Sequence, residues 1–308
     1  KLDGNYPTGT DNVAMGDTAL DSIAAGGTDN VAIGNHSGTA ITTGDKNTAV
    51  GSLSLEANTT ASYNTAVGFS SLKTNITGAG NTGLGYRSLE LTTAANNTGL
   101  GYEAGAANAG GASNTAIGKS ALCKNTTGNS NVAVGISALF ANTTADNNVA
   151  IGQQALTSNT TGTRNVAVGC GALLSNVNDN DNTGIGFATL VNSSGQSNTA
   201  VGSCALNTNT TGSCNVAMGR DALLANAAGS CNSAVGAFAL DANTTAIRNN
   251  AFGYNALTNT TEGNSNNAFG TGALQLNTTG ANNVAMGQNA LVANTTASDN
   301  TAVGYLSL

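Results

Sequence analysis

The hydrophobic and polar positions of the chain follow one pattern that recurs about every 17 residues from end to end. Each repeat contains Asn, usually Thr or Val, a small residue, a large apolar residue and Gly, as in residues 47–51 and 148–152. Eighteen glycines close this motif, and fourteen of the seventeen intervals between them are 17 residues long. So short and regular a period predicts one solenoid coil per repeat, because each coil can bury apolar side chains only against its neighbours.

Each motif is predicted to form a short β-strand, and we number its positions from the repeat Gly as 0. Successive strand side chains point to opposite faces, so positions −1 and −3 share one face and positions −2 and −4 share the other. The residue at −1 is always large and apolar, for example Ile117, Val134, Ile151 and Val168. We therefore expect position −1 to point into the core.

A second apolar column is predicted at position +4, which is Leu in sixteen of the eighteen repeats. Leu122, Leu139, Leu156 and Leu173 should be buried and stacked, with the residues at −1 opposite them. The polar stretch that follows, often Asn-Thr-Thr-Gly, is typical of a turn. These features predict an all-β chain, a parallel β-solenoid (β-roll) of about 18 coils that forms a single array over residues 1–308.

The two remaining strand positions predict close contacts. Asn occupies position −4 in every repeat, and its side-chain amides are expected to stack from coil to coil as a hydrogen-bonded ladder. Position −2 is always Ala or Gly, although a solvated position would tolerate longer side chains. Small residues there predict that this face packs against another chain or, alternatively, against the protein's own loop.

Charge and composition argue against several functions. Only 8% of the residues are charged, the formal net charge is −7, and the Lys and Arg residues are scattered, so a nucleic-acid partner is not expected. No apolar run is long enough to span a bilayer. His36 is the only histidine, and the acidic stretch 178–182 lacks the Gly and closing Glu of a calcium loop. We therefore predict no enzyme activity, no metal and no cofactor.

Asn-x-Ser/Thr sequences suggest a possible glycan coat. Nine of them place their Asn at the equivalent position +7, so that one edge of the coils would carry glycans, although Asn-Thr-Thr is also favourable turn chemistry. The nine candidate acceptors are Asn58, Asn75, Asn125, Asn142, Asn159, Asn209, Asn243, Asn277 and Asn294.

Two further sets of residues recur at equivalent positions. Cys214 and Cys231 both lie five residues before a repeat Gly, and the expected spacing of about 4.8 Å between coils would allow a disulfide or two stacked free thiols. Phe69, Tyr86 and Tyr102 each follow a repeat Gly in consecutive coils. They could form an exposed stacked patch that holds a sugar or a partner chain, or a simple surface ladder.

The motifs resemble those of known surface proteins. Residues 30–34, Asn-Val-Ala-Ile-Gly, are similar to head repeats of trimeric autotransporter adhesins, and the longer pattern resembles repeats of bacterial, phage and viral tail-fibre-like proteins. The resemblance covers nearly the whole chain and implies a left-handed β-roll in an extracellular or virion-surface fibre or adhesin. The chain has a longer coil than the adhesin heads and no stalk or heptad segment, so trimerisation is not implied.

The leading hypothesis is a structural component of an extracellular fibre or filament that assembles by self-association, as a head-to-tail filament, as a lateral homo-oligomer such as a trimer, or as both. Leu2 and Leu308 occupy equivalent positions eighteen repeats apart, which favours head-to-tail contact. The alternatives are a carbohydrate-binding adhesin and an ice-binding solenoid that presents ranks of Thr such as Thr143–Thr144. Only one Thr of each adjacent pair can face outward, which weakens the ice-binding hypothesis.

Overall fold

A computed structural model describes residues 10–24 and 26–308, in which each repeat forms one coil with one three-residue strand. Leu2 lies outside the described residues. The coils belong to two compact units, Lys1–Gln154 with Ser158–Thr161, and Ala155–Thr157 with Gly162–Leu308. The first unit contains β1 (Val13–Met15), β2 (Val31–Ile33), β3 (Thr48–Val50), β4 (Thr65–Val67), β5 (Thr82–Leu84), β6 (Thr98–Leu100), β7 (Thr115–Ile117), β8 (Val132–Val134) and β9 (Val149–Ile151). The second contains β10 (Val166–Val168), β11 (Thr183–Ile185), β12 (Thr199–Val201), β13 (Val216–Met218), β14 (Ser233–Val235), β15 (Asn250–Phe252), β16 (Asn267–Phe269), β17 (Val284–Met286) and β18 (Thr301–Val303).

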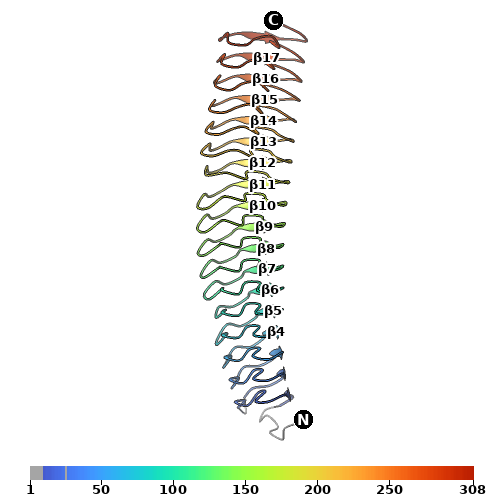
Figure 1. Ribbon diagram of the computed structural model, residues 1–308, viewed down its shortest axis with the longest axis vertical. Coiled ribbons are helices and arrows are strands. Elements are labelled where there is room, and N and C mark those ends of the chain that lie inside the picture. Colours follow the sequence, from blue (N-terminus) through green and yellow to red (C-terminus); the bar gives the residue numbers. More distant parts are fainter. Residues whose placement is uncertain (1–9, 25) are drawn as a thin grey trace. The chain divides into compact units, whose positions relative to one another are not determined.

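Within each unit, successive strands pair in parallel and in register (Figure 1). Ala49 of β3 lies opposite Ala66 of β4, and Ala217 of β13 lies opposite Ala234 of β14. Turns connect the strands, and the described residues contain no helix, hence none long and apolar enough to cross a membrane. The prediction of a parallel β-solenoid with coils of about 17 residues is confirmed.

The Leu column at position +4 forms the core of the coils, as predicted. Leu122, Leu139, Leu156 and Leu173 are all fully buried. Where the repeat carries Gly38 in place of Leu, the buried side chain of Ile41 fills the space, and a Cβ added at Gly38 would lie 3.0 Å from its Cδ1.

The expected direction of the large residue at −1 is wrong. Ile117, Val134 and Val168 are partly exposed and Ile151 is 40% exposed, so none of the four opposes the Leu column from inside. The alternation of side chains along the strand was correct, but position −2 points inward instead. The coil is too narrow for two large side chains in one layer. A Cβ added at Gly99, which occupies −2, would already lie 2.8 Å from Cγ of Leu89.

The prediction that positions −2 and −4 face another chain is also wrong. Ala133, Ala150 and Ala167 are completely buried within the isolated chain. Their column faces the chain's own residues at +3 and +4, as the hydrogen bond from Ser71 Oγ to the carbonyl oxygen of Gly83 illustrates (2.9 Å). The alternative expectation, in which the protein's own loop lines this face, is the correct one.

The Asn residues at −4 form the expected buried ladder. The Oδ1 atom of Asn114 accepts hydrogen bonds from the backbone nitrogen and Nδ2 of Asn131, at 2.9 and 3.2 Å. The same Nδ2 also donates to the carbonyl oxygen of Ala145, at 2.8 Å. The Oδ1 of Asn131 in turn accepts from the backbone nitrogen of Asn148, at 3.0 Å. Each amide therefore links its coil to the neighbouring coils and also bonds to a backbone carbonyl oxygen 14 residues further along the chain. These bonds satisfy the polar groups of a buried column.

A glycine that recurs where strand becomes turn is expected to adopt positive φ or to let two backbones approach closely, and the repeat Gly does both. At Gly118 φ is +123°, and an added Cβ would lie 2.8 Å from the carbonyl atoms of Gly135 in the next coil. The repeat pattern does not predict, however, that the Leu at +4 also adopts the left-handed conformation, with φ of +51° at Leu122 and +52° at Leu139. The backbone turns sharply at this position, since the nitrogen of Asn142 donates to the carbonyl oxygen of Leu139 (3.3 Å).

Candidate functional site: the outward face of the strands

Positions −3 and −1 of the strands point outward and form an uncharged, largely apolar surface in each unit, which we call the strand face. In the first unit its residues at −1 are Met15, Ile33, Val50, Val67, Leu84, Leu100, Ile117, Val134 and Ile151. In the second they are Val168, Ile185, Val201, Met218, Val235, Phe252, Phe269, Met286 and Val303. All of these side chains are partly or fully exposed, and position −3 carries Val, Thr, Ser or Asn, also without charge.

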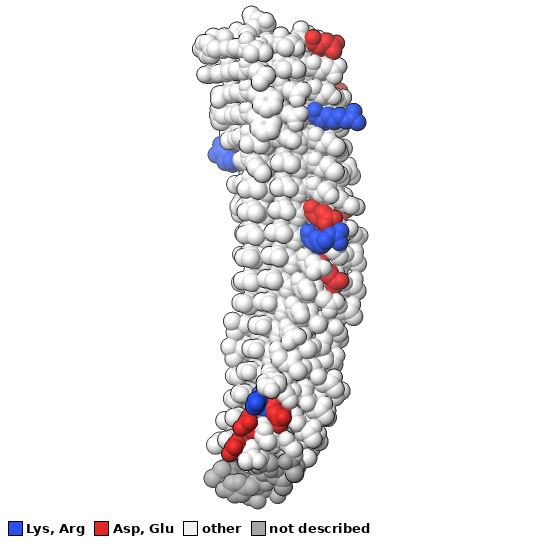
Figure 2. Space-filling model, turned by 180° about the vertical axis from the view of Figure 1, so that it is seen from behind, with Lys and Arg blue, Asp and Glu red and all other residues white. Residues whose placement is uncertain are grey.

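An apolar outer face is unusual for a parallel sheet, because such sheets are normally covered on both faces. Leu84 and Leu100 are 42% and 41% exposed in the first unit, and Ile185 is 40% exposed in the second. Contiguous apolar surface of this kind marks contact sites on soluble proteins. Charged side chains, by contrast, form only a few isolated clusters on the side of the molecule seen in Figure 2. The strand face is thus the strongest candidate for an interaction site.

One segment of the strand face differs from the rest. Phe252 and Phe269 stack in adjacent coils with ring centroids 5.0 Å apart and planes inclined by 5°, and they are 38% and 39% exposed. Beside them at position −3, Nδ2 of Asn250 donates to Oδ1 of Asn267, at 2.8 Å. This group of four residues, which we call the Phe–Asn cluster, combines the largest side chains of the strand face with its only amides.

The three aromatic residues singled out in the sequence lie in one exposed column. The rings of Phe69 and Tyr86 are 5.6 Å apart, those of Tyr86 and Tyr102 are 5.1 Å apart, and both pairs are stacked. Lys119 lies 5.9 Å from the ring centroid of Tyr102. The rings therefore cover one another's faces, whereas a sugar that stacks on an aromatic residue needs a free ring face. This geometry favours a surface ladder over a sugar platform.

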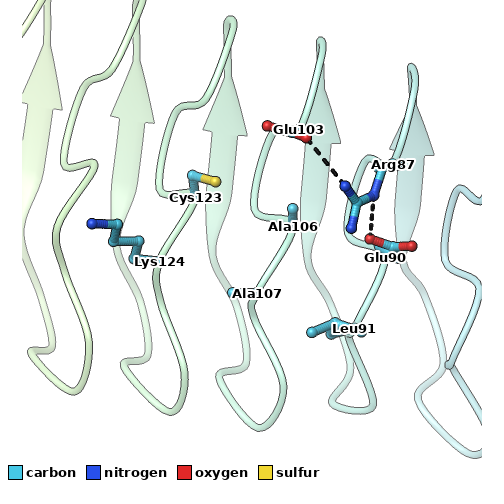
Figure 3. A pocket seen from close by; sticks show the side chains of 8 residues that line it. All are labelled: Arg87, Glu90, Leu91, Glu103, Ala106, Ala107, Cys123 and Lys124. Carbon is cyan, nitrogen blue, oxygen red and sulfur yellow. Dashed lines mark hydrogen bonds and ion pairs between the residues drawn. The ribbon is translucent and has the colours of Figure 1, made fainter.

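Next to this column, Arg87 joins two carboxylates over a shallow hollow of about 220 Å³ (Figure 3). Its Nε lies 2.6 Å from Glu90 Oε2, and its Nη1 lies 3.4 Å from Glu103 Oε1. The hydrogen bond with Glu90 raises the pKa of Arg87, and the negative charge of Glu103 raises the pKa of Tyr102. On a neighbouring coil, partial burial raises the pKa of the Cys123 thiol and so disfavours its thiolate. Of the two ion pairs, Arg87–Glu103 links adjacent coils, whereas Arg87–Glu90 lies within one coil.

The nine Asn residues considered as glycan acceptors do not line an outer edge, and that prediction is wrong. Eight of them are fully buried, and Asn294 is partly buried. They form a second internal ladder: Nδ2 of Asn142 donates to Oδ1 of Asn125 at 2.7 Å and to the carbonyl oxygen of Ala145 at 3.1 Å. An engaged, buried amide has no room for a glycan. The Asn-Thr-Thr sequences are therefore turn chemistry, as the alternative interpretation held.

This second ladder contains a fault that a substitution should repair. Thr260 replaces Asn at +7, and Oδ1 of Asn243 in the preceding coil is buried without a hydrogen-bond partner. Thr260→Asn would supply a donor to that oxygen and would keep an acceptor for Nδ2 of Asn277, which now donates to Thr260 Oγ1 at 3.3 Å. We expect about 1 kcal/mol of added stability, the usual net value of one buried hydrogen bond, measured by chemical denaturation. The exposed substitution Thr271→Asn is the control, and a destabilised Thr260→Asn variant would contradict the ladder.

The remaining candidate residues are placed as follows. Cys214 and Cys231 are exposed free thiols at equivalent positions before β13 and β14, which pair in register, so a disulfide between them stays a prediction. His36 Nδ1 lies 3.1 Å from Thr18 Oγ1. In the acidic stretch 178–182, the hydrogen bond from Arg164 lowers the pKa of Asp181. Among the described residues, no three His, Cys, Asp or Glu side chains are grouped closely enough to hold a metal ion.

Comparison with known proteins gives no matching family model and no matching curated protein. The resemblance of the repeats to adhesin heads and tail-fibre-like proteins therefore remains a prediction, and the functional argument rests on the geometry described above.

Proposed function

We propose that the protein is a structural component of an extracellular fibre at a cell or virion surface, and that it assembles by lateral self-association through the strand face. The observation that carries this proposal is the uncharged apolar outer face of a parallel sheet, repeated coil after coil in each unit. The extracellular location is supported by the resemblance of the repeats to those of surface adhesins and tail-fibre-like proteins.

The length of the array matters energetically. Covering the exposed part of one Leu or Ile at −1 contributes about 1 kcal/mol, at about 25 cal/mol per Å² of apolar surface. The loss of translational and rotational freedom, about 4–15 kcal/mol, is incurred once for the whole contact. A few coils are therefore too short to associate, whereas nine consecutive coils reach the range in which association becomes favourable. This relation gives a reason for repeating one coil so many times.

The observations favour self-association over the two alternative functions. Sugar binding is disfavoured because the rings of Phe69, Tyr86 and Tyr102 cover one another. Ice binding through the paired Thr residues is disfavoured because the hydroxyl of the first Thr of a pair is engaged between coils, as in the hydrogen bond from Thr126 Oγ1 to the carbonyl oxygen of Thr143 (2.8 Å). The strand face itself varies from Val to Phe, which does not suit the ordering of a regular water layer.

Charge on the strand face should prevent association without unfolding the chain. We expect the double variant Leu84→Lys/Ile185→Lys to self-associate at least tenfold more weakly than the original chain, because each Lys would lose its hydration in the contact without a partner. Analytical ultracentrifugation over a concentration series measures the association, and circular dichroism checks that β-structure is retained.

The matched control places the same two charges in exposed turns of the same units, as Thr127→Lys/Thr211→Lys. This control should associate like the original chain. An original chain that stays monomeric at all accessible concentrations, or a strand-face variant that associates normally, would rule out the proposed assembly. Electron microscopy of the purified chain and immunogold labelling of the source material then test the fibre and its surface location.

A further inference from the structure

The strand face contains one feature that can set how two copies align, and this inference rests on the proposed self-association. We propose that the Phe–Asn cluster, formed by Asn250, Phe252, Asn267 and Phe269, fixes the register in which the strand faces of two copies pair. In the paired state the cluster of one copy faces the cluster of the other.

A uniform periodic surface cannot define its own register. If one copy slides past its partner by a single coil, about 4.8 Å, every residue at −1 meets the next residue of the same column. Val, Ile, Leu and Met at these positions are similar in size and uncharged, so the slipped pairing buries nearly the same surface. Register is weakly specified wherever one repeat is equivalent to the next. A residue that departs from the repeat is needed to break this equivalence.

The Phe–Asn cluster departs from the repeat in two independent ways. Phe252 and Phe269 are the only aromatic side chains at −1, and their stacked rings occupy two adjacent coils. A partner must provide matching space there, because overfilled or underfilled contacts are unfavourable.

The amides give the second constraint. Asn250 and Asn267 are the only residues with amide side chains at −3, and one hydrogen bond joins them at 2.8 Å. Once the strand face is covered, their remaining donors and acceptors lose water and need polar partners. A partner slipped by one coil offers an amide to only one of the two Asn residues and Val or Ser to the other, whereas an aligned partner offers amides to both. A single buried Asn sets the register of coiled coils by the same mechanism.

The partner that fits is a second copy of this chain. An uncharged surface whose side chains recur once per coil is matched over many coils only by another surface with the same rise per coil. A protein with a different spacing would meet the strand face over a few coils, too few to offset the loss of freedom on association. The Phe–Asn cluster also complements itself, because aromatic rings pack on rings and amides bond to amides.

The register can be measured separately from the affinity. In a chain whose five cysteines are replaced by Ser, a nitroxide label at Glu262→Cys reports the distance between two copies by dipolar electron paramagnetic resonance. Glu262 is exposed, in the turn between β15 and β16, and lies outside the strand face. The original cluster should give one narrow distance between copies.

The test variant replaces the cluster with residues typical of the repeat, Asn250→Thr/Phe252→Val/Asn267→Thr/Phe269→Val. It should still associate, with an association constant within about tenfold of the original, but its distances should spread over several values separated by about one coil rise. The control Met218→Val/Met286→Val changes position −1 in the same unit and should keep the single distance. One unchanged narrow distance in the test variant would overturn the proposed role of the cluster. Absence of any distance between copies in the original chain would overturn self-association itself.

Discussion

Replacing Leu139 with Asp is expected to unfold the coils around β8. The side chain of Leu139 is fully buried between the Leu residues of adjacent coils, and no cation lies in that column. Loss of a core Leu costs about 2–5 kcal/mol, and a buried charge without a partner costs several more. Since each coil is stabilised only by its neighbours, the damage should spread to adjacent coils. Hydrogen–deuterium exchange should show lost protection there, with reduced β-structure by circular dichroism.

Two controls make this prediction specific to the inside of the coil. Leu139→Met keeps the volume and should cost less than about 1.5 kcal/mol. Val134→Asp makes an equally large change in polarity in the same coil, but at position −1, which points outward. It should leave the isolated chain folded and weaken only its association. If Val134→Asp unfolded the coil while Leu139→Asp did not, the assignment of the inner and outer faces would be reversed.

The substitution Asn131→Asp is expected to have the second largest effect. The change removes Nδ2, which donates to the carbonyl oxygen of Ala145 and is one of two donors to Oδ1 of Asn114, and it places a carboxylate in a buried column. Unsatisfied buried groups cost about 1–3 kcal/mol each, and the buried charge adds to this. We therefore expect a loss of at least about 3 kcal/mol at neutral pH, measured by chemical denaturation.

The same variant should show a characteristic dependence on pH. Burial raises the pKa of the new carboxyl above its unfolded value of about 3.9, so the folded state binds more protons than the unfolded state between the two values. The destabilisation should be smallest below pH 4 and should grow as the pH rises through the folded pKa. Asn147→Asp, the same chemical change at an exposed position, should lack this dependence. Equal pH profiles for the two variants would argue against a buried ladder at −4.

The repeat made much of the local structure predictable. The strand of residues 132–134, the buried Leu139, the Asn ladder through Asn131 and the unusual backbone of Gly135 all follow from period, side-chain alternation and residue type. These features depend on contacts between equivalent positions of adjacent coils. Because the repeat itself defines those contacts, the sequence was sufficient to predict them.

Two features could not be predicted from the pattern, and both concern the width of the coil. Alternation divides a strand into two faces but does not say which one is inside, and the hydrophobicity of Val134 pointed to the wrong face. The sequence Asn142-Thr143-Thr144 fitted both an exposed glycan acceptor and an internal turn. In the folded coil, the buried interior holds the Leu column, small residues at −2 such as Ala133, and the amides of the two Asn ladders. The sequence by itself therefore determined the solenoid and its ladders, whereas the narrow cross-section, a property of the closed coil alone, decided that the large apolar residues face outward.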